Sequence, residues 1–249
     1  MSDLSGKRAL VTGASKGIGA GIARALGAAG ASVAVGYSSD EQGAERTVAT
    51  IKRAGGQALA IRADVSEALD VQRMFSDVTA ELGSLDVLVN NAAVYSFQQF
   101  ADITIDEFHR QYDTNVLGLI LATQAFLAQP GLGGGSIVNI LTSDIKTNRP
   151  GAALYTSTKG AVTALTRTMA KEFARQQVRV NAIAPGATET EGARAANLFG
   201  GELEEMIVKA TPLGRVGTPD DIGPVAVFLA SEDSRWITGE VLYASGGIH

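Results

Sequence analysis

The chain has 249 residues, of which 45% are hydrophobic and 19% are charged, and its formal net charge is −5. This size suits one large α/β core, and an acidic balance without basic runs argues against nucleic acid as a partner. Because the chain has no cysteine, disulfides, thiolate catalysis and cysteine-ligated metals are excluded. His109 and His249 are too few for a histidine-rich metal site. Without an apolar stretch of signal-peptide or membrane-span length, we expect a cytoplasmic protein and no membrane partner.

Short apolar runs alternate with longer amphipathic segments along the chain. The apolar runs predict buried strands at 9–11, 33–35, 58–61, 87–89, 137–141, 178–183 and 241–243. The amphipathic segments predict helices over 18–26, 40–54, 66–82, 104–129, 153–176 and 218–230, with Thr104 and Thr218 as N-caps. The alternation predicts a single domain over 1–249, with a parallel sheet covered by helices on both faces. Residues 188–217 break the rhythm, and we expect an irregular loop over the substrate there.

A glycine-rich segment follows the first predicted strand and opens the first predicted helix. Its spacing is G-x-x-x-G-x-G, and glycines let a backbone turn sharply and approach a pyrophosphate closely. A helix N-terminus adds free N–H groups, so the segment predicts nucleotide binding, with a ligand-free glycine turn as the alternative. The candidate contacts are Gly13, Ser15, Lys16, Gly17, Ile18 and Gly19.

The end of the second predicted strand indicates which nucleotide binds. Tyr37, Ser38 and Ser39 lie there, and no carboxylate occurs before Asp40. An acidic residue at the strand end would hold a ribose 2′-hydroxyl and favour NAD. Lys16 could instead meet a 2′-phosphate, to which the two serines could donate. NADP(H) is therefore favoured, and NAD(H) stays possible because Lys16 could be merely solvated.

Tyr155 and Lys159 lie four residues apart and so share one face of a predicted helix. A free tyrosine titrates near pH ~10, and a nearby ammonium favours the phenolate and lowers that pKa. The pair is a candidate proton-transfer device, although the same spacing also occurs on solvated helix faces.

Together these features resemble the short-chain dehydrogenase/reductase family over the whole chain, and within it the 3-oxoacyl-acyl-carrier-protein reductases. The matching motifs are Thr12-Gly13-x-x-x-Gly17-x-Gly19, Asp64-Val65, Asn90-Asn91-Ala92, Asn115, Tyr155-x-x-x-Lys159 and Pro185-Gly186. The resemblance implies a Rossmann-type, doubly wound sheet of about seven strands and an NAD(P)-dependent enzyme. It also implies a homotetramer formed through two long helices and the C-terminal strand, to which Trp236, Val241 and Leu242 could contribute.

The resemblance implies roles for the matching positions. Asp64 and Val65 would contact adenine, the Asn90-Asn91-Ala92 motif would line the ribose side, and Thr188 after Pro185-Gly186 would bind the carboxamide. Lys159 would also bind the nicotinamide ribose, and Asn115 would form part of a helix kink and a proton relay through water to Lys159. Asp64 could instead cap the following helix, and Asn90 could satisfy turn backbone.

Two positions depart from the family pattern. Ala93 replaces the usual glycine after Asn-Asn-Ala. Family members place a serine thirteen residues before the tyrosine, and that register falls here on Thr142, with Ser143 next. Register favours Thr142 as the hydroxyl donor, whereas a one-residue loop difference would favour Ser143. We expect only one to serve, because neighbouring strand residues point to opposite faces.

The expected reaction interconverts a carbonyl (a ketone, aldehyde or 3-oxoacyl group) and an alcohol by hydride transfer, with Tyr155 as acid/base. Residues 129–135, expected near the entrance, contain no lysine or arginine, which weakens the acyl-carrier interpretation. An NAD-linked sugar or alcohol dehydrogenase and a non-catalytic NAD(P)-binding or sensing protein remain alternatives. The candidates for a partly apolar substrate pocket, which could equally be core or interface residues, are Tyr95, Phe97, Leu198, Phe199 and Met206.

Overall fold

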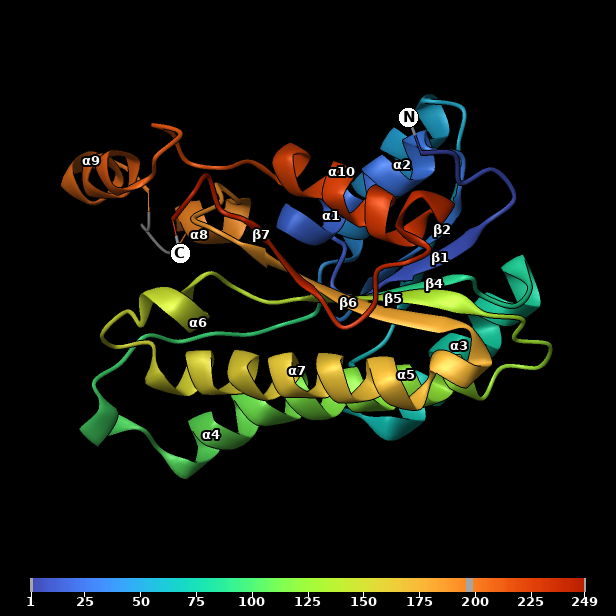
Figure 1. Cartoon of the computed structure of the whole chain (residues 1–249), viewed down its shortest axis with the longest axis horizontal. Helices are drawn as coiled ribbons and strands as arrows, with labels where there is room; N and C mark the ends of the chain where they lie inside the picture. The colour runs from blue at the N-terminus through green and yellow to red at the C-terminus, as the bar shows by residue number, and fades with distance from the viewer. Residues whose placement is uncertain (1, 196–198, 249) are drawn as a thin grey trace.

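The computed structural model describes residues 2–195 and 199–248, and they are built around one seven-stranded sheet (Figure 1). The strands are β1 (Arg8–Val11), β2 (Ser32–Tyr37), β3 (Gln57–Arg62), β4 (Val87–Asn90), β5 (Gly135–Ile140), β6 (Val178–Pro185) and β7 (Val241–Ala244). Their order is β3-β2-β1-β4-β5-β6-β7, and every neighbouring pair is parallel. The predicted Rossmann-type parallel sheet is confirmed.

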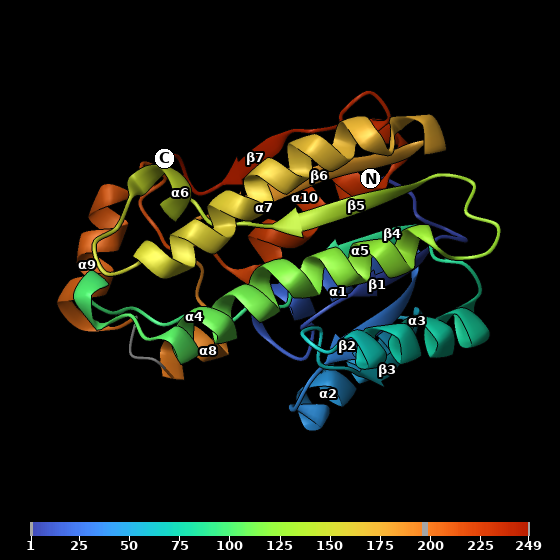
Figure 2. The same ribbon diagram turned by 90° about the horizontal axis from the view of Figure 1, so that it is seen from below.

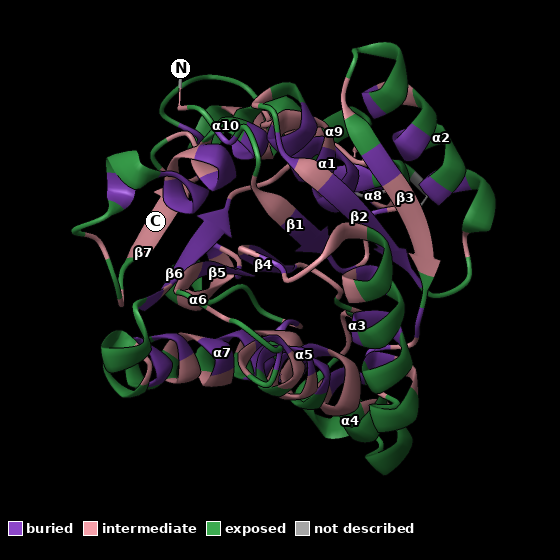
Figure 3. Ribbon diagram, turned by 90° about the vertical axis from the view of Figure 1, so that its right-hand side faces the viewer, coloured by how far each residue is buried: buried purple, intermediate pink, exposed green. Residues whose placement is uncertain are grey.

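Ten α-helices are present among the described residues, and most of them cover the two faces of the sheet. They are α1 (Gly17–Ala28), α2 (Glu41–Arg53), α3 (Ala68–Leu82), α4 (Ile105–Tyr112), α5 (Gly118–Leu127), α6 (Asp144–Thr147), α7 (Ala153–Glu172), α8 (Glu191–Ala195), α9 (Gly201–Ala210) and α10 (Pro219–Ala230). Three short turns of 3₁₀-helix are η1 (Phe100–Asp102), η3 (Ala174–Gln176) and η4 (Glu232–Ser234). Helices α1, α2 and α10 cover one face, and α3, α5 and α7 the other (Figures 1 and 3).

The apolar strands are buried on both sides, because alternate residues point to opposite faces. Val11 and Val89 belong to the core cluster beneath α1 and α10, whereas Leu10 and Leu88 belong to the cluster beneath α5 and α7. The inner strands β1, β2, β4, β5 and β6 are almost continuously buried, whereas the edge strands β3 and β7 are mostly of intermediate burial (Figure 3). Burial on both faces explains why they read as unbroken apolar runs.

The expected long helix over 104–129 is interrupted. Helix α4 ends at Tyr112, a π-helical turn η2 spans Asp113–Leu117, and α5 continues to Leu127. Thr104 does cap α4, because its Oγ1 accepts a hydrogen bond from the backbone N–H of Glu107 at 3.2 Å.

The segment 188–217 is not the irregular loop we expected. It contains α8 and α9, and α6 is a further short helix that the pattern did not predict. Thr218 is the N-cap of α10 as predicted, and together with Asp221 it forms a capping box.

The chain passes from β3 at one edge of the sheet back to β4, on the far side of β1, so the strand order reverses between β1 and β4. In open parallel sheets, ligands bind beyond the carboxyl ends of the strands at such a switch point. Helices α6, α8 and α9 gather at this end (Figures 1 and 2).

Residues 131–135 instead lie near Lys7 and Arg8 and lead into the start of β5, at the opposite end. Their lack of basic residues therefore says nothing about the entrance. Among the described helices, none has the length and apolarity needed to cross a membrane.

Candidate active site

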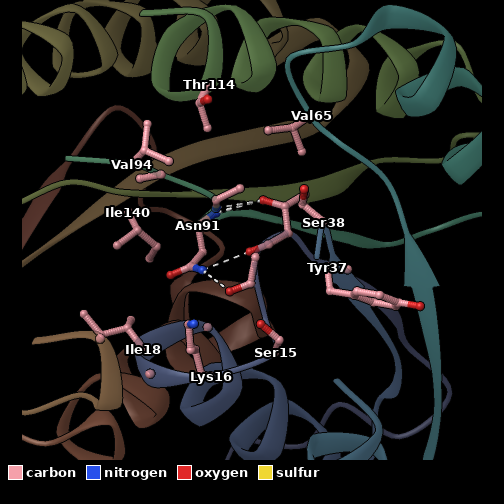
Figure 4. A pocket seen from close by; sticks show the side chains of 18 of the residues that line it. Ser15, Lys16, Ile18, Tyr37, Ser38, Val65, Asn91, Val94, Thr114 and Ile140 are labelled. Atoms are coloured by element: carbon pink, nitrogen blue, oxygen red, sulfur yellow. Dashed lines mark hydrogen bonds between the residues drawn. The ribbon is translucent and has the colours of Figure 1, made fainter. Parts of the chain in front are cut away.

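A cleft of about 460 Å³ opens at the carboxyl ends of β1, β2 and β4 (Figure 4). Most of the predicted cofactor residues line it, namely Gly13, Ser15, Lys16, Gly17, Ile18, Gly19, Tyr37, Ser38, Ser39, Asp64, Val65, Asn91, Ala92, Tyr155 and Lys159. Sequence reasoning missed several other lining residues, including Val94, Thr114, Ile140, Thr190 and Gly192. Of these residues, only Ile140 could have been predicted from the sequence, because it ends a predicted strand and strand ends form the rim of such a cleft.

The glycine-rich loop has the shape of a phosphate cradle. Gly13 and Gly17 have φ of +62° and +58°, a region that disfavours residues with a Cβ. A Cβ on Gly19 would lie 2.4 Å from the Asn91 side-chain nitrogen, so no larger residue fits there. That Asn91 nitrogen donates at 2.9 Å to the carbonyls of Thr12 and Gly13 (Figure 4). The pinned loop, with the N-terminus of α1 behind it, fits a dinucleotide pyrophosphate.

The end of β2 holds a carboxylate that sequence reasoning had set aside. Asp40 lines the cleft, and its side chain lies 3.8 Å from the ammonium of Lys16. The same carboxylate accepts a hydrogen bond from the Gly43 N–H at 2.9 Å and so caps α2. Ser38 and Ser39 are exposed at the rim. The ammonium of Lys16 and the hydroxyls of Ser38 and Ser39 therefore lie at the part of the cleft where we expect a ribose 2′ substituent. The Asp40 carboxylate lies there too, but Lys16 and the Gly43 N–H already interact with it.

Asp64 lines the cleft as predicted, but it does not cap the next helix. Its carboxylate accepts hydrogen bonds from the backbone and the hydroxyl of Ser66, at 3.0 and 2.6 Å. Helix α3 begins later, at Ala68. Asp64 therefore fixes the turn that presents Val65 to the cleft.

Asn90 is not among the residues that line the cleft; it lines a small neighbouring cavity together with Ala92 and Lys159, and its role on the ribose side stays a prediction. It is buried, and its side-chain nitrogen donates to Thr123 on α5 and to Asn139 on β5, at 3.3 and 3.0 Å. Asn90 has the same strand parity as Leu88, so it faces α5, and the next residue, Asn91, faces the loop. This parity was readable from the sequence.

Tyr155 lies on the first turns of α7, with aromatic rings on its open side. The ring centroids of Tyr95 and Phe97 are 5.8 and 6.2 Å from that of Tyr155. Burial, followed by the negative charge of Asp144, raises the pKa of Tyr155 above its ordinary value. A side-chain hydrogen bond with Thr142 acts in the opposite direction. The phenol therefore keeps its proton at neutral pH.

Lys159 shares the helix face with Tyr155, as their spacing predicts. Its ammonium lies 5.7 Å from the centre of the Tyr155 ring and donates to the Ile140 carbonyl at 2.8 Å. Burial lowers the pKa of Lys159 to about 8. The pKa of Tyr155 is therefore raised and not lowered as expected: burial is the largest cause, and the positive charge that acts against it is that of Arg149.

The two competing hydroxyls occupy different settings. Thr142 is half-buried and forms the hydrogen bond with Tyr155, while its Oγ1 also accepts from the Asp144 N–H at 3.2 Å. Ser143 is 5% exposed, and its backbone N–H donates to the Pro185 carbonyl at 2.8 Å. Both line a second cavity together with Tyr155, and of the two only Thr142 is among the groups that shift the pKa of Tyr155.

Asn115 lies in the π-helical turn, and its side chain is fully engaged. Its Oδ1 accepts from the Val94 N–H, and its Nδ2 donates to the Val94 carbonyl, both at 2.8 Å. Nδ2 also donates to Thr158 on α7 at 3.1 Å. Asn115 and Lys159 both line a small cavity of about 10 Å³, which is near the lower limit for holding one water molecule. The amide therefore ties α7 to the loop after β4, and a water relay would have to use this cavity.

A second cavity of about 400 Å³ joins the cleft at Tyr155, which lines both. Its lining includes Tyr95, Phe97, Thr142, Ser143, Pro185, Gly186, Thr188, Phe199, Leu203 and Ile207. Arg149 lies 4.0 Å from the centre of the Phe97 ring and pairs with Asp144 at 2.9 Å. Of the pocket candidates, Met206 is 67% exposed and outside this lining, and Leu198 falls outside the described residues.

Comparison with known proteins agrees with this architecture. Residues 13–249 match the family model described as Enoyl-(Acyl carrier protein) reductase. An uncharacterized oxidoreductase from Methylorubrum extorquens is 49% identical over all of both chains. The structure of the angucycline C-6 ketoreductase LanV with bound NADP is 34% identical, with a TM-score of 0.92, over 99% of this chain and 97% of LanV. A 7α-hydroxysteroid dehydrogenase complexed with NADH and 7-oxo glycochenodeoxycholic acid is 35% identical, with a TM-score of 0.93, over 98% and 95% of the two chains.

The chain is thus an oxidoreductase that belongs to the short-chain dehydrogenase/reductase family. The comparisons do not single out the acyl-carrier-protein subgroup within it.

Proposed function

We propose that this protein is an NADP(H)-dependent oxidoreductase that interconverts a ring ketone and its alcohol, with Tyr155 as the acid/base. One observation carries the proposal: Tyr155 lies where the cofactor cleft meets the apolar cavity. A group at that junction can reach both a dinucleotide and a carbonyl compound.

The side chains around the junction have separable tasks in this reaction. The nicotinamide cofactor supplies or accepts the hydride when it is bound. Tyr155 holds a proton at neutral pH, because burial raises its pKa, and can give that proton to the carbonyl oxygen. Thr142 orients the phenol and can donate to the same oxygen. Lys159 places a positive charge near the Tyr155 ring. This charge stabilises the phenolate that forms when the proton leaves.

NADP(H) is favoured over NAD(H) by the charges at the rim of the cleft. Lys16 is half exposed, and Ser38 and Ser39 present free hydroxyls, which together suit a 2′-phosphate. Asp40 is the group that would favour NAD(H), but its carboxylate is already shared by Lys16 and the Gly43 N–H. The two structural relatives carry NADP in one case and NADH in the other, so the preference rests on these residues.

A ring ketone suits the second cavity because its walls are flat and apolar. Tyr95 and Phe97 pack at a centroid distance of 5.4 Å on one side, and Phe199, Leu203 and Ile207 line another part. Both structural relatives have names that describe chemistry at a numbered ring carbon, as the C-6 and 7-oxo designations indicate. A flexible 3-oxoacyl chain would leave the aromatic wall without a stacking partner.

The test is a spectrophotometric screen of NADPH and NADH oxidation with ring ketones, aldehydes and 3-oxoacyl thioesters. We expect turnover with NADPH and a ring ketone. Tyr155→Phe should keep the Kd for NADPH and lose about 10²- to 10⁴-fold in kcat. Thr142→Val should lose about 10- to 100-fold in kcat, and the matched control Ser143→Ala should change little.

Three results would contradict the proposal. NADPH binding without turnover across the whole panel would favour a sensing protein, and a preference for NADH with sugars would favour a sugar dehydrogenase. Near-normal turnover by Tyr155→Phe would remove the tyrosine from the mechanism.

A further inference from the structure

Glu191, the first residue of α8, reaches the glycine-rich loop. Its Oε2 accepts a hydrogen bond from the backbone N–H of Gly17 at 3.0 Å. Gly17 opens α1, so this N–H belongs to the first turn, whose N–H groups lack partners within the helix. Those N–H groups and the positive end of the helix dipole are what bind a phosphate. The Glu191 carboxylate therefore occupies a place on the loop where a phosphate would bind.

The start of α8 packs against the loop through a second contact. A Cβ on Gly17 would lie 3.2 Å from Cγ2 of Thr190, so the Thr190 side chain sits directly on the loop backbone. Thr190 and Gly192 both line the cofactor cleft. The chain just before α8 is held in place, because the Glu189 N–H donates to the Gly217 carbonyl at 2.9 Å.

Among the ion pairs of the described residues, none includes Glu191. In the described part of the chain, the nearby cations are paired elsewhere: Lys16 with Asp40, and Arg194 with Glu189. The Gly17 N–H is the polar partner that holds the Glu191 carboxylate against the glycine-rich loop. A second anion brought to the same N–H would compete for one donor and would also be repelled by the carboxylate.

We propose that Glu191 competes with the cofactor's pyrophosphate for the Gly17 N–H, so that dinucleotide binding displaces the carboxylate and releases α8 from the loop. This inference rests on the proposed cofactor. Thr190 lines both cavities and Ala193 lines the substrate cavity, so release of α8 reshapes the wall that the carbonyl compound meets. The exchange links cofactor binding to the substrate cavity and makes Glu191 a determinant of cofactor affinity.

The test compares Glu191→Ala with the matched control Glu189→Ala, which removes a carboxylate that faces Arg194 instead of the loop. Glu191 is exposed and Glu189 is half-buried, so neither substitution empties the core and both variants should fold. We expect the Kd for NADPH, measured by calorimetry, to be about 3- to 10-fold lower in Glu191→Ala than in wild type. Glu189→Ala should bind as wild type does. Without cofactor, amide hydrogen exchange over residues 13–19 should be faster in Glu191→Ala and unchanged in the control.

An unchanged or higher Kd in Glu191→Ala would overturn the inference and leave the proposed function intact, as would unchanged exchange in the loop. If neither wild type nor the variants bound NADPH or NADH, the proposed function itself would fail and the inference with it. Equal tightening in both variants would show a general charge effect and would also overturn a specific role for Glu191.

Discussion

Lys159 is a buried ammonium whose pKa falls to about 8, whereas burial moves the pKa of Tyr155 upward. The two groups therefore titrate in separate ranges. As pH rises through about 8, Lys159 loses the charge that supports proton release by Tyr155. We predict that kcat/KM for carbonyl reduction falls on the alkaline side with an apparent pKa near that of Lys159, which a pH–rate profile measures.

Lys159→Arg supplies the control for this assignment. Arginine keeps its charge far above pH 8, so the alkaline fall should move to higher pH even where the absolute rate is lower. A fall that stays near pH 8 in Lys159→Arg would assign the titration to another group. Tyr155 is not that group, because its pKa lies above the ordinary tyrosine value.

At the scale of elements, the π-helical turn between α4 and α5 is held by one amide. Asn115 is 2% exposed and satisfies both backbone groups of Val94 as well as bonding Thr158. Asn115→Ala would leave the Val94 groups unpaired beside the cofactor cleft. We predict a loss of about 2 to 4 kcal/mol in the free energy of unfolding, measured by urea denaturation. Thr114→Ala, in the same turn, should lose much less, and equal losses would show that the turn depends on something other than the amide.

The elements were predictable to different degrees, for physical reasons. The strands were found because burial on both faces makes them uniformly apolar, and the caps of α4 and α10 were found because capping is local. The break at Asn115 was not located as a π-helical turn, since its partners lie on the loop after β4 and on α7, far away in sequence. Helices α8 and α9 were missed because packing of the segment 188–217 against the rest of the fold is invisible in a local pattern.

The site shows the same division between spacing and environment. Spacing brought Tyr155 and Lys159 to one helix face, and the glycine spacing located the cradle. The pKa directions depend on how much water the fold removes, which no spacing reveals. The hydrogen bond between the Gly17 N–H and Glu191 joins two segments that are far apart in sequence. No sequence motif predicts this contact.

For the whole molecule, we propose a homotetramer, which the family resemblance implies and the surface supports. Large apolar side chains are exposed at several places, and we place the interfaces at two of them: Phe100 in η1 and Ile105 at the start of α4, 79% and 76% exposed, and Trp236 just after η4, 97% exposed. A closed tetramer with dihedral symmetry needs two different self-complementary interfaces, and one region can serve each. Strand β7 is also the last strand of the sheet, and an edge strand can pair with or pack against a second copy.

We therefore predict that light scattering after size-exclusion chromatography gives four chain masses for the wild-type protein. Ile105→Asp and Trp236→Ser should each reduce this to two chain masses, because each variant disrupts one interface and leaves the other. Leu69→Asp is the matched control: Leu69 is 78% exposed on α3, outside both regions, and its variant should remain tetrameric. A monomeric wild type would refute the assembly, and loss of the tetramer in Leu69→Asp would place an interface on α3 instead. The double variant Ile105→Asp/Trp236→Ser should be monomeric. Its turnover tests whether one subunit holds a complete site, which we expect because both cavities meet at Tyr155 within one chain.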